Sequence, residues 1–157
     1  MSNKIKIGVI ITDKSERILL IKEKISKNPI PLWNIIKGSY GDFDETVFDA
    51  ALRECKEEAG VEIELTSLLG SYISQQGNDV RVQFTFIGRI LGGVPTLANK
   101  ADQLLRNESI SELKWFTKED VNNLHKNEFI SLRTYAMIRD WLKEDIYQLK
   151  SVKQIEM

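Results

Sequence analysis

The segment spanning residues 38–61 limits the fold of this chain more than any other. It changes from a glycine-containing loop to a helical pattern over Val47–Ala59, and Gly60 follows the last helical position. Thr46 stands directly before the helix with Asp49 three positions later, which predicts a capping box, and a glycine just past the end is typical of a helix terminus. Because β-rich runs lie on both sides of this helix, the sequence predicts a mixed α/β domain.

Two hairpins are expected in the β-rich parts of the chain. Lys4–Thr12 alternates apolar and polar residues and is followed, across a short polar turn, by the apolar run Arg17–Lys22. Val61–Gln76 and Val80–Leu91 flank the turn Gly77-Asn78-Asp79 in the same way. The other expected elements are short strands over Leu32–Ile36 and Leu113–Phe116, loops over Lys37–Asp44 and Asn99–Ser109, and helices over Lys118–Leu124 and Phe129–Leu149. The last helix is expected to bury a stripe of Leu132, Tyr135, Ile138 and Leu142.

Composition indicates one soluble domain. The 157 residues suit a single domain spanning 1–157, and 42% of them are apolar, which is too many for a disordered chain. No apolar run approaches the roughly 18 residues that a membrane span needs, and the first residues lack a signal-peptide core. Cys55 is the only cysteine, so no internal disulfide can form and a cytoplasmic location is expected.

Charge is distributed unevenly along the chain. Nine acidic and two basic residues between Gly41 and Glu64 give that segment a formal charge of −7, which leaves +6 for the rest of a chain whose net charge is −1. The near-neutral total argues against a polybasic nucleic-acid binder, and no Arg/Lys stripe with interleaved aromatics is present. The acidic segment can hold cations, and the basic remainder can face the phosphates that those cations bind.

Three glutamates, Glu54, Glu57 and Glu58, fall on one face of the predicted helix, because positions three and four apart are neighbours. Their mutual repulsion costs roughly a few tenths of a kcal/mol per pair, which Arg53 can partly offset through Glu57. The arrangement becomes favourable when a divalent cation lies between the carboxylates. Oxygen ligands without His or Cys favour Mg²⁺ or Mn²⁺ over zinc. Taken alone, such a triplet also fits a solvated acidic helix face.

Glu45, the seven residues after it and the run Arg53-Glu54-Cys55-Lys56-Glu57-Glu58-Ala59-Gly60-Val61 resemble the Nudix box, G-x5-E-x7-R-E-U-x-E-E-x-G-U, where U is a bulky apolar residue. The box covers about residues 38–61. The resemblance implies the Nudix fold, an α/β/α sandwich with a mixed β-sheet between helices. Counting back from Arg53 places the first glycine of the box at Ser39. Either Ser39 replaces it, or Gly38 is retained with one extra loop residue; the second is preferred, because Lys37-Gly38-Ser39 resembles a Pro-Lys-Gly variant of the family.

The resemblance also implies chemistry, the hydrolysis of a nucleoside diphosphate linked to another group by water attack at phosphorus. The metal ligands that it implies are Glu54, Glu57, Glu58 and the carbonyl oxygen of Gly38, with Mg²⁺ as the expected cofactor and Mn²⁺ as a substitute. Arg53 would orient the glutamates, and Glu45 would hold Arg53 or act in the outer ligand shell. The general base is a box glutamate in some members and a loop glutamate before the last strand in others. Glu108 and Glu112 are the loop candidates here.

Other side chains are candidates for substrate contacts or for packing. Lys37, Gly38 and Ser39 adjoin the glutamates and are expected to bind substrate, while Arg81 and Gln83 can face the cleft from their strand. The residues expected to serve structure rather than chemistry are Trp33, Trp115 and Cys55 in the core and His125 at the surface.

The resemblance leaves the substrate open. The proline typical of ADP-ribose hydrolases is absent near Gln76, Gly77-Asn78-Asp79 stands where dinucleoside polyphosphate hydrolases carry a tyrosine, and Ser74-Gln75-Gln76-Gly77 matches the NADH-type motif poorly. A nucleoside triphosphate pyrophosphohydrolase of the MutT group is therefore the leading expectation. Hydrolysis of dinucleoside polyphosphates or RNA 5′ ends and a non-catalytic ligand sensor are the alternatives. A small nucleotide is the expected partner, without membrane or nucleic acid, and a homodimer is left open.

Overall fold

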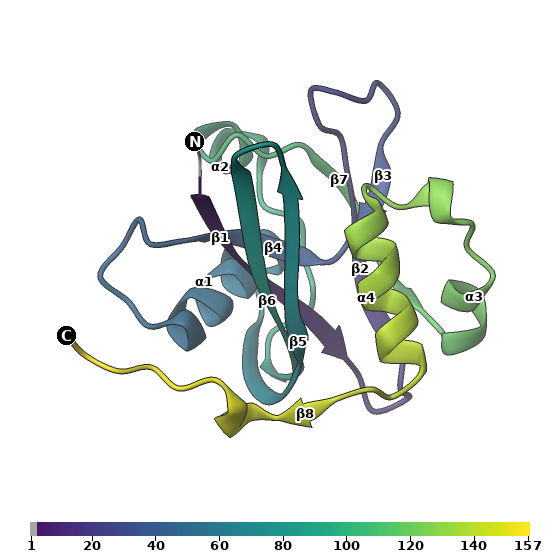
Figure 1. Ribbon diagram of the computed structural model, residues 1–157. Coiled ribbons are helices and arrows are strands. Elements are labelled where there is room, and N and C mark those ends of the chain that lie inside the picture. Colours follow the sequence, from purple (N-terminus) through teal and green to yellow (C-terminus); the bar gives the residue numbers. More distant parts are fainter. Residues whose placement is uncertain (1–2) are drawn as a thin grey trace.

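The computed structural model describes residues 3–157 and contains a mixed eight-stranded β-sheet with helices on its faces (Figure 1). The strands are β1 (Asn3–Thr12), β2 (Ile18–Glu23), β3 (Leu32–Asn34), β4 (Ile36–Tyr40), β5 (Glu62–Gln76), β6 (Asp79–Gly92), β7 (Ile110–Phe116) and β8 (Tyr147–Gln148). The helices are α1 (Val47–Ala59), α2 (Lys100–Leu105), α3 (Lys118–Asn122) and α4 (Leu132–Leu142), with single 3₁₀ turns η1 (Lys126–Glu128) and η2 (Leu149–Ser151).

The long strand β1 organises the sheet. It pairs in parallel with β6 from Asn3 opposite Val80 to Thr12 opposite Arg89, and in antiparallel with β2 and β4. The sheet order is β3-β2-β1-β6-β5-β8, with β4 added on β1 and β7 on β2. Both predicted hairpins, β1–β2 and β5–β6, are confirmed.

The two faces of the sheet carry separate apolar cores. On β1, Ile7, Val9 and Ile11 pack in the cluster that contains the apolar side of α1, whereas Ile10 packs in the cluster that contains α4. This alternation follows from the two-residue period of a strand, and burial on both faces explains why β1 is apolar along its second half. The predicted arrangement, a mixed sheet between helices, is confirmed (Figure 1).

Helix α1 has the boundaries that the sequence predicts. The Thr46 side chain accepts a hydrogen bond from the backbone N–H of Asp49 at 3.1 Å, and Gly60 closes the helix with a φ of +66°. Cys55 is fully buried in the core between α1 and the sheet, which confirms its packing role. Apolar packing on one side thus leaves the glutamate-bearing side of α1 toward β4.

Two predicted loops are wrong in part, because each contains a regular element. Residues 36–40 form β4, because Gly38 and its neighbours pair continuously with β1, a long-range partner that loop-like composition does not reveal. Residues 100–105 form the short helix α2, with Asn99 as its N-cap. In addition, the single strand predicted over 32–36 is two strands, β3 and β4, that meet at Ile35.

The predicted C-terminal helix is too long. Phe129 and Ile130 are extended against Trp33, whose carbonyl accepts a hydrogen bond from the Ile130 N–H at 2.9 Å, so α4 begins only after Ser131. It buries Thr134, Met137, Ile138 and Trp141, and Leu132 is 71% exposed. Of the predicted stripe, Ile138 is buried and Tyr135 and Leu142 pack partly buried against the same core, so the prediction is wrong only for Leu132. No helix in the range 3–157 combines the length and apolar character that a membrane span requires.

Candidate active site

The glutamate side of α1 faces a cavity of about 430 Å³. Its walls come from β4, from the glutamates of α1 and from the residues before β7, which pass beside the end of α1. Strand β1 adds Lys6 and strand β2 adds Glu23. Elements that are far apart in the sequence thus meet around the acidic helix face.

Three carboxylates converge in this cavity. Glu54 and Glu57 of α1 and Glu108, before β7, each offer an oxygen that lies within 4.8 Å of the others. Glu58 is buried beside them, and its Oε2 accepts a hydrogen bond from the backbone N–H of Lys37 at 3.3 Å. The other loop candidate, Glu112, lies exposed on β7 and does not join the cluster.

Gly38 lies against the Glu54 carboxylate. A Cβ atom at position 38 would stand 1.8 Å from Oε1 of Glu54 and 1.9 Å from its Cδ, so no side chain fits there while Glu54 keeps its place. Ser39, the next residue, points its hydroxyl to the Lys6 Nζ, which donates a hydrogen bond at 2.8 Å. The close approach favours Gly38 over Ser39 as the glycine of the box, in agreement with the preference drawn from the sequence pattern.

Arg53 ties the acidic groups together. Its guanidinium donates to Glu45 Oε1 at 2.8 Å, to Glu54 Oε1 at 2.9 Å and to Glu57 Oε2 at 3.3 Å. These carboxylates, Glu45 above all through its hydrogen bonds, raise the pKa of Arg53 above its ordinary value. The guanidinium also lies over the ring of Phe43, 4.7 Å from its centroid. A charged fork held on several sides fixes the rotamers of the glutamates around it.

Arg106 fixes Glu108 in the cluster and was missed by the sequence analysis. Its Nη2 donates to the carbonyl oxygen of Glu57 at 2.9 Å and its Nε to Glu108 Oε1 at 3.1 Å. One side chain therefore joins the end of α1 to the segment that carries Glu108. No sequence signal marked it, because an arginine in a segment taken for a loop is common.

Replacing Arg106 with glutamine should lower kcat about 10- to 100-fold, the usual effect of losing a group that orients a metal ligand. Glu108 would lose its charged partner, and the segment before β7 would lose its link to α1. The core would stay unchanged. Steady-state hydrolysis rates test this, with Arg89→Gln as the matched control, since Arg89 pairs with Glu64 on an exposed part of β6. Equal rates for both variants would contradict the positioning role.

Burial changes the proton affinity of the cluster. Desolvation, together with the charge of Glu57, raises the pKa of Glu54 to about 7 against the opposing effect of Arg53. Desolvation, followed by the charge of Glu54, holds the pKa of Glu58 well above its ordinary value, and desolvation also raises the pKa of Glu108. Crowded, buried carboxylates of this kind resist ionisation unless a cation joins them.

The raised pKa of Glu54 predicts a pH-dependent stability of the metal-free protein. The folded state holds the Glu54 proton more tightly than the unfolded chain, so the free energy of unfolding falls as the pH rises from 4.5 to about 7 and stays lowered above that. Glu54→Gln removes this loss. In EDTA, the variant should gain about 2–3 kcal/mol over the wild type between pH 4.5 and pH 8, measured by urea unfolding. A difference that does not change with pH would contradict the raised pKa.

The cluster fits a divalent cation. Oε2 of Glu108 is buried and has no hydrogen-bond partner in residues 3–157. One carboxylate oxygen of the cluster is therefore free to coordinate a cation. The donor set consists of oxygens, with no His or Cys among the three clustered side chains. Hard cations with oxygen ligands match such a set.

The remaining predicted site residues lie at different places. Lys37, Gly38 and Ser39 line the same cavity as the glutamates, whereas Arg81 lines a neighbouring cavity.

The residues expected to serve structure lie outside the cavity. Trp33 is buried as predicted, Trp115 packs partly buried on the core below α1, and His125 is exposed and caps η1. Gln83 is buried on β6. Lys6 was not predicted, because only the pairing of β1 with β4 brings it beside Ser39.

Residues 2–137 match the model of the NUDIX domain, and the chain belongs to this family. It is 34% identical over 122 residues to an ADP-ribose pyrophosphatase of Methanocaldococcus jannaschii, a match that covers 76% of this chain and 63% of that protein. It is 36% identical over 85 residues to a putative 8-oxo-dGTP diphosphatase of Bacillus subtilis, covering 54% of this chain and 52% of the relative. The chain thus spans about half to two thirds of the length of these curated relatives.

Solved structures share the fold. A NUDIX hydrolase from Nitrosomonas europaea superposes with a TM-score of 0.78 at 18% identity and covers 98% of both chains. The MutT protein from Methanosarcina mazei superposes with a TM-score of 0.70 at 16% identity, covering 92% of this chain and 96% of that one. These similarities confirm the α/β Nudix fold expected from the box.

Proposed function

We propose that this chain hydrolyses a diphosphate linkage in a small nucleotide with the help of Mg²⁺, and that its substrate is a nucleoside triphosphate, which it converts to a monophosphate and pyrophosphate. The observation that carries the proposal is the convergence of Glu54, Glu57 and Glu108 within 4.8 Å, beside a glycine that leaves Glu54 room. Carboxylates arranged in this way neutralise phosphate charge through a bound cation, which is what transfer at phosphorus requires.

The chain's own residues supply positioning and proton transfer. Glu54, Glu57, Glu58 and the Gly38 carbonyl would hold Mg²⁺ or Mn²⁺, with Glu108 as a further ligand, and the cation when bound would polarise phosphate oxygens and lower the pKa of bound water. Arg53 keeps the glutamates in place, and Glu45 keeps Arg53 in place. Glu108 is also the candidate general base, because its Oε2 has no hydrogen-bond partner among residues 3–157 and desolvation raises its pKa above the ordinary value of a carboxylate. Lys37 and Ser39 line the cavity where substrate phosphates would lie.

A second candidate substrate is ADP-ribose. The relative that matches 76% of this chain is named ADP-ribose pyrophosphatase, which favours this substrate, while the residues around Gln76 lack the proline expected for it. Both reactions break a diphosphate and use the same cluster. The substrate therefore depends on the residues that surround the nucleotide rather than on the glutamates.

A substrate panel tests the proposal. Nucleoside triphosphates, 8-oxo-dGTP, ADP-ribose, a dinucleoside tetraphosphate and 5′-triphosphorylated RNA are incubated with the protein and Mg²⁺ or EDTA, and products are separated by ion-exchange chromatography. We expect a monophosphate and pyrophosphate from a nucleoside triphosphate, with Mg²⁺ only. Tight binding of one compound without turnover of any would support a ligand sensor instead.

We propose further that residues 1–157 act as one cytoplasmic domain. The fully buried Cys55 thiol supports this, because a lone buried thiol needs no oxidising compartment.

A homodimer stays a prediction from family resemblance. Light scattering tests it against the 18.1 kDa mass of one chain.

A further inference from the structure

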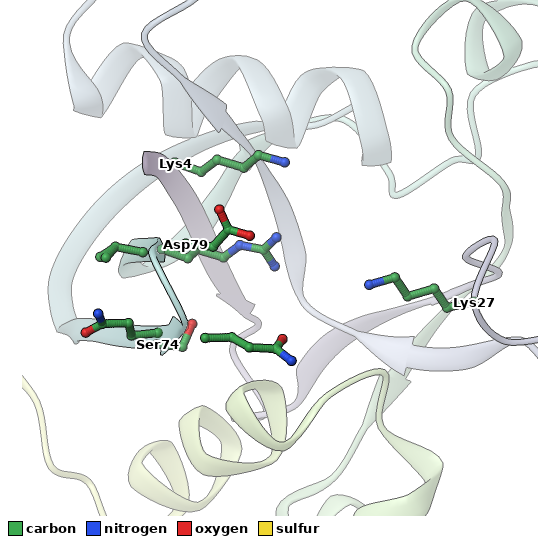
Figure 2. Close-up of a pocket in the computed structure, with 8 residues that line it drawn as sticks. Lys4, Lys27, Ser74 and Asp79 are labelled. Atoms are coloured by element: carbon green, nitrogen blue, oxygen red, sulfur yellow. The ribbon is translucent and has the colours of Figure 1, made fainter. Parts of the chain in front are cut away.

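A second cavity lies on the face of the sheet that carries α4. It has a volume of about 490 Å³ and is formed at the ends of β1, β5 and β6 and by the segment between β2 and β3. Figure 2 shows Lys4 and Lys27 extending their ammonium groups into this space from opposite sides, with Asp79 and Ser74 on the strand side. None of its lining residues belongs to the glutamate cluster.

The lining of this cavity is positively charged. Three cationic side chains, Lys4, Lys27 and Arg81, face one carboxylate, Asp79. Lys4 and Arg81 are register partners on the parallel strands β1 and β6, which places two like charges side by side. Within residues 3–157, none of the three cations forms an ion pair of 4.0 Å or less. An anion from outside the chain would relieve the repulsion between these cations.

Helix α4 adds a further cation. Arg133, near the start of the helix, donates a hydrogen bond from Nη1 to the Ser74 hydroxyl at 3.2 Å, and Ser74 lines the cavity. Arg133 also forms no ion pair in the described part of the chain. Desolvation, followed by the charge of Arg81, lowers the pKa of Arg133. Because Ser74 is also the register partner of Arg81 on β5 and β6, the two arginines lie near each other at the cavity wall.

Polar residues connect this cavity with the active site. Lys6 lies two residues after Lys4 on the same face of β1 and lines the cavity of the glutamates, where its Nζ reaches Ser39. Its register partner on β6 is Gln83, two residues after Arg81. Oε1 of Gln83 is buried without a hydrogen-bond partner, an acceptor for which residues 3–157 supply no donor. A ligand that extends from the glutamates toward Arg81 would follow this polar row.

We propose that the cavity around Arg81, Lys4 and Arg133 binds a phosphate that the substrate carries in addition to the diphosphate that is cleaved. The inference rests on the proposed function and specifies its substrate class, nucleotides phosphorylated again on the nucleoside side. Such a phosphate is either a 3′-phosphomonoester or the phosphodiester to a second nucleotide. A phosphate fits better than a single carboxylate because it can accept hydrogen bonds from several cations at once.

Calorimetry with product-like nucleotides tests the inference without turnover. The wild-type protein is titrated in Mg²⁺ with adenosine and guanosine 5′-monophosphates, with the 3′,5′-bisphosphates and with the 5′-phosphorylated dinucleotides. We expect at least a tenfold lower Kd for a compound with the added phosphate. A stronger effect of the bisphosphate assigns the cavity to a monoester, and a stronger effect of the dinucleotide assigns it to a phosphodiester.

Substitutions assign the effect to the cavity. Arg81→Gln and Arg133→Gln should remove most of the gain from the added phosphate and leave the Kd of the monophosphates within about threefold, whereas Arg89→Gln, at the other end of β6, should keep the gain. Equal Kd values for monophosphates and bisphosphates in the wild type would overturn the inference. A retained gain in both arginine variants would overturn it as well. Absence of hydrolysis in the substrate panel, with the binding gain present, would overturn the proposed function alone.

Discussion

Replacing Glu57 with glutamine is expected to lower kcat about a thousandfold while the protein stays folded. Glu57 brings its carboxylate within 4.8 Å of Glu54 and Glu108, and glutamine keeps its size but removes its charge. A bound cation stabilises developing charge on phosphate by several kcal/mol, and each 1.36 kcal/mol corresponds to about a tenfold change in rate. Single-turnover hydrolysis at saturating Mg²⁺ measures the loss.

Glu62→Gln is the matched control for this substitution. Glu62 begins β5 just beyond α1 and has a 73% exposed side chain, which forms a long ion pair of 3.9 Å with Lys56. It should keep the wild-type rate. Both variants should melt within about 4 °C of the wild type, because neither side chain contributes to the core. A Glu57→Gln enzyme with unchanged turnover would contradict the role of the cluster.

Gly38→Ala should lower kcat about a hundredfold and weaken Mg²⁺ affinity. The added methyl group would stand 1.8 Å from Glu54 Oε1, so the carboxylate must leave its place and its 2.9 Å contact with Arg53. Displacement of a reacting or ligating group by about 1 Å can cost about a hundredfold in rate. Rates measured across a Mg²⁺ titration separate weaker cation binding from slower chemistry.

Gly92→Ala is the control for this loss. A Cβ at position 92, at the end of β6, would meet only Glu62 Oε2 at 3.9 Å, an ordinary contact. Its rate and Mg²⁺ dependence should match those of the wild type. If Gly38→Ala retained the wild-type rate, Gly38 would not be the box glycine on which the position of Glu54 depends.

Local signals predicted helix α1 well. The boundaries of α1 follow from its 3.6-residue apolar period, from the Thr46 cap and from Gly60, all of which act over a few residues. The same period places Glu54 and Glu57 on a common face, so two of the three clustered carboxylates could be paired from the sequence.

Long-range pairing explains what the sequence did not predict. β4 forms because β1 pairs with it, which carries Gly38 to Glu54 and Lys6 to Ser39. Glu108 could be proposed only as one of two loop glutamates, since Arg106 selects it through contacts with α1 that span many residues of chain. The cavity around Arg81 likewise requires three strands and α4 to meet.

Binding of Mn²⁺, followed by electron paramagnetic resonance, tests the central claim that the fold assembles a cation site from Glu54, Glu57 and Glu108. Free Mn²⁺ is titrated with the wild type, with Glu108→Gln and with the surface control Glu62→Gln. Glu108 is the decisive position, because only the tertiary fold brings it to the helix glutamates. We predict that Glu108→Gln weakens Mn²⁺ binding at least tenfold and that Glu62→Gln does not. Equal Mn²⁺ affinity in the wild type and Glu108→Gln would contradict the account.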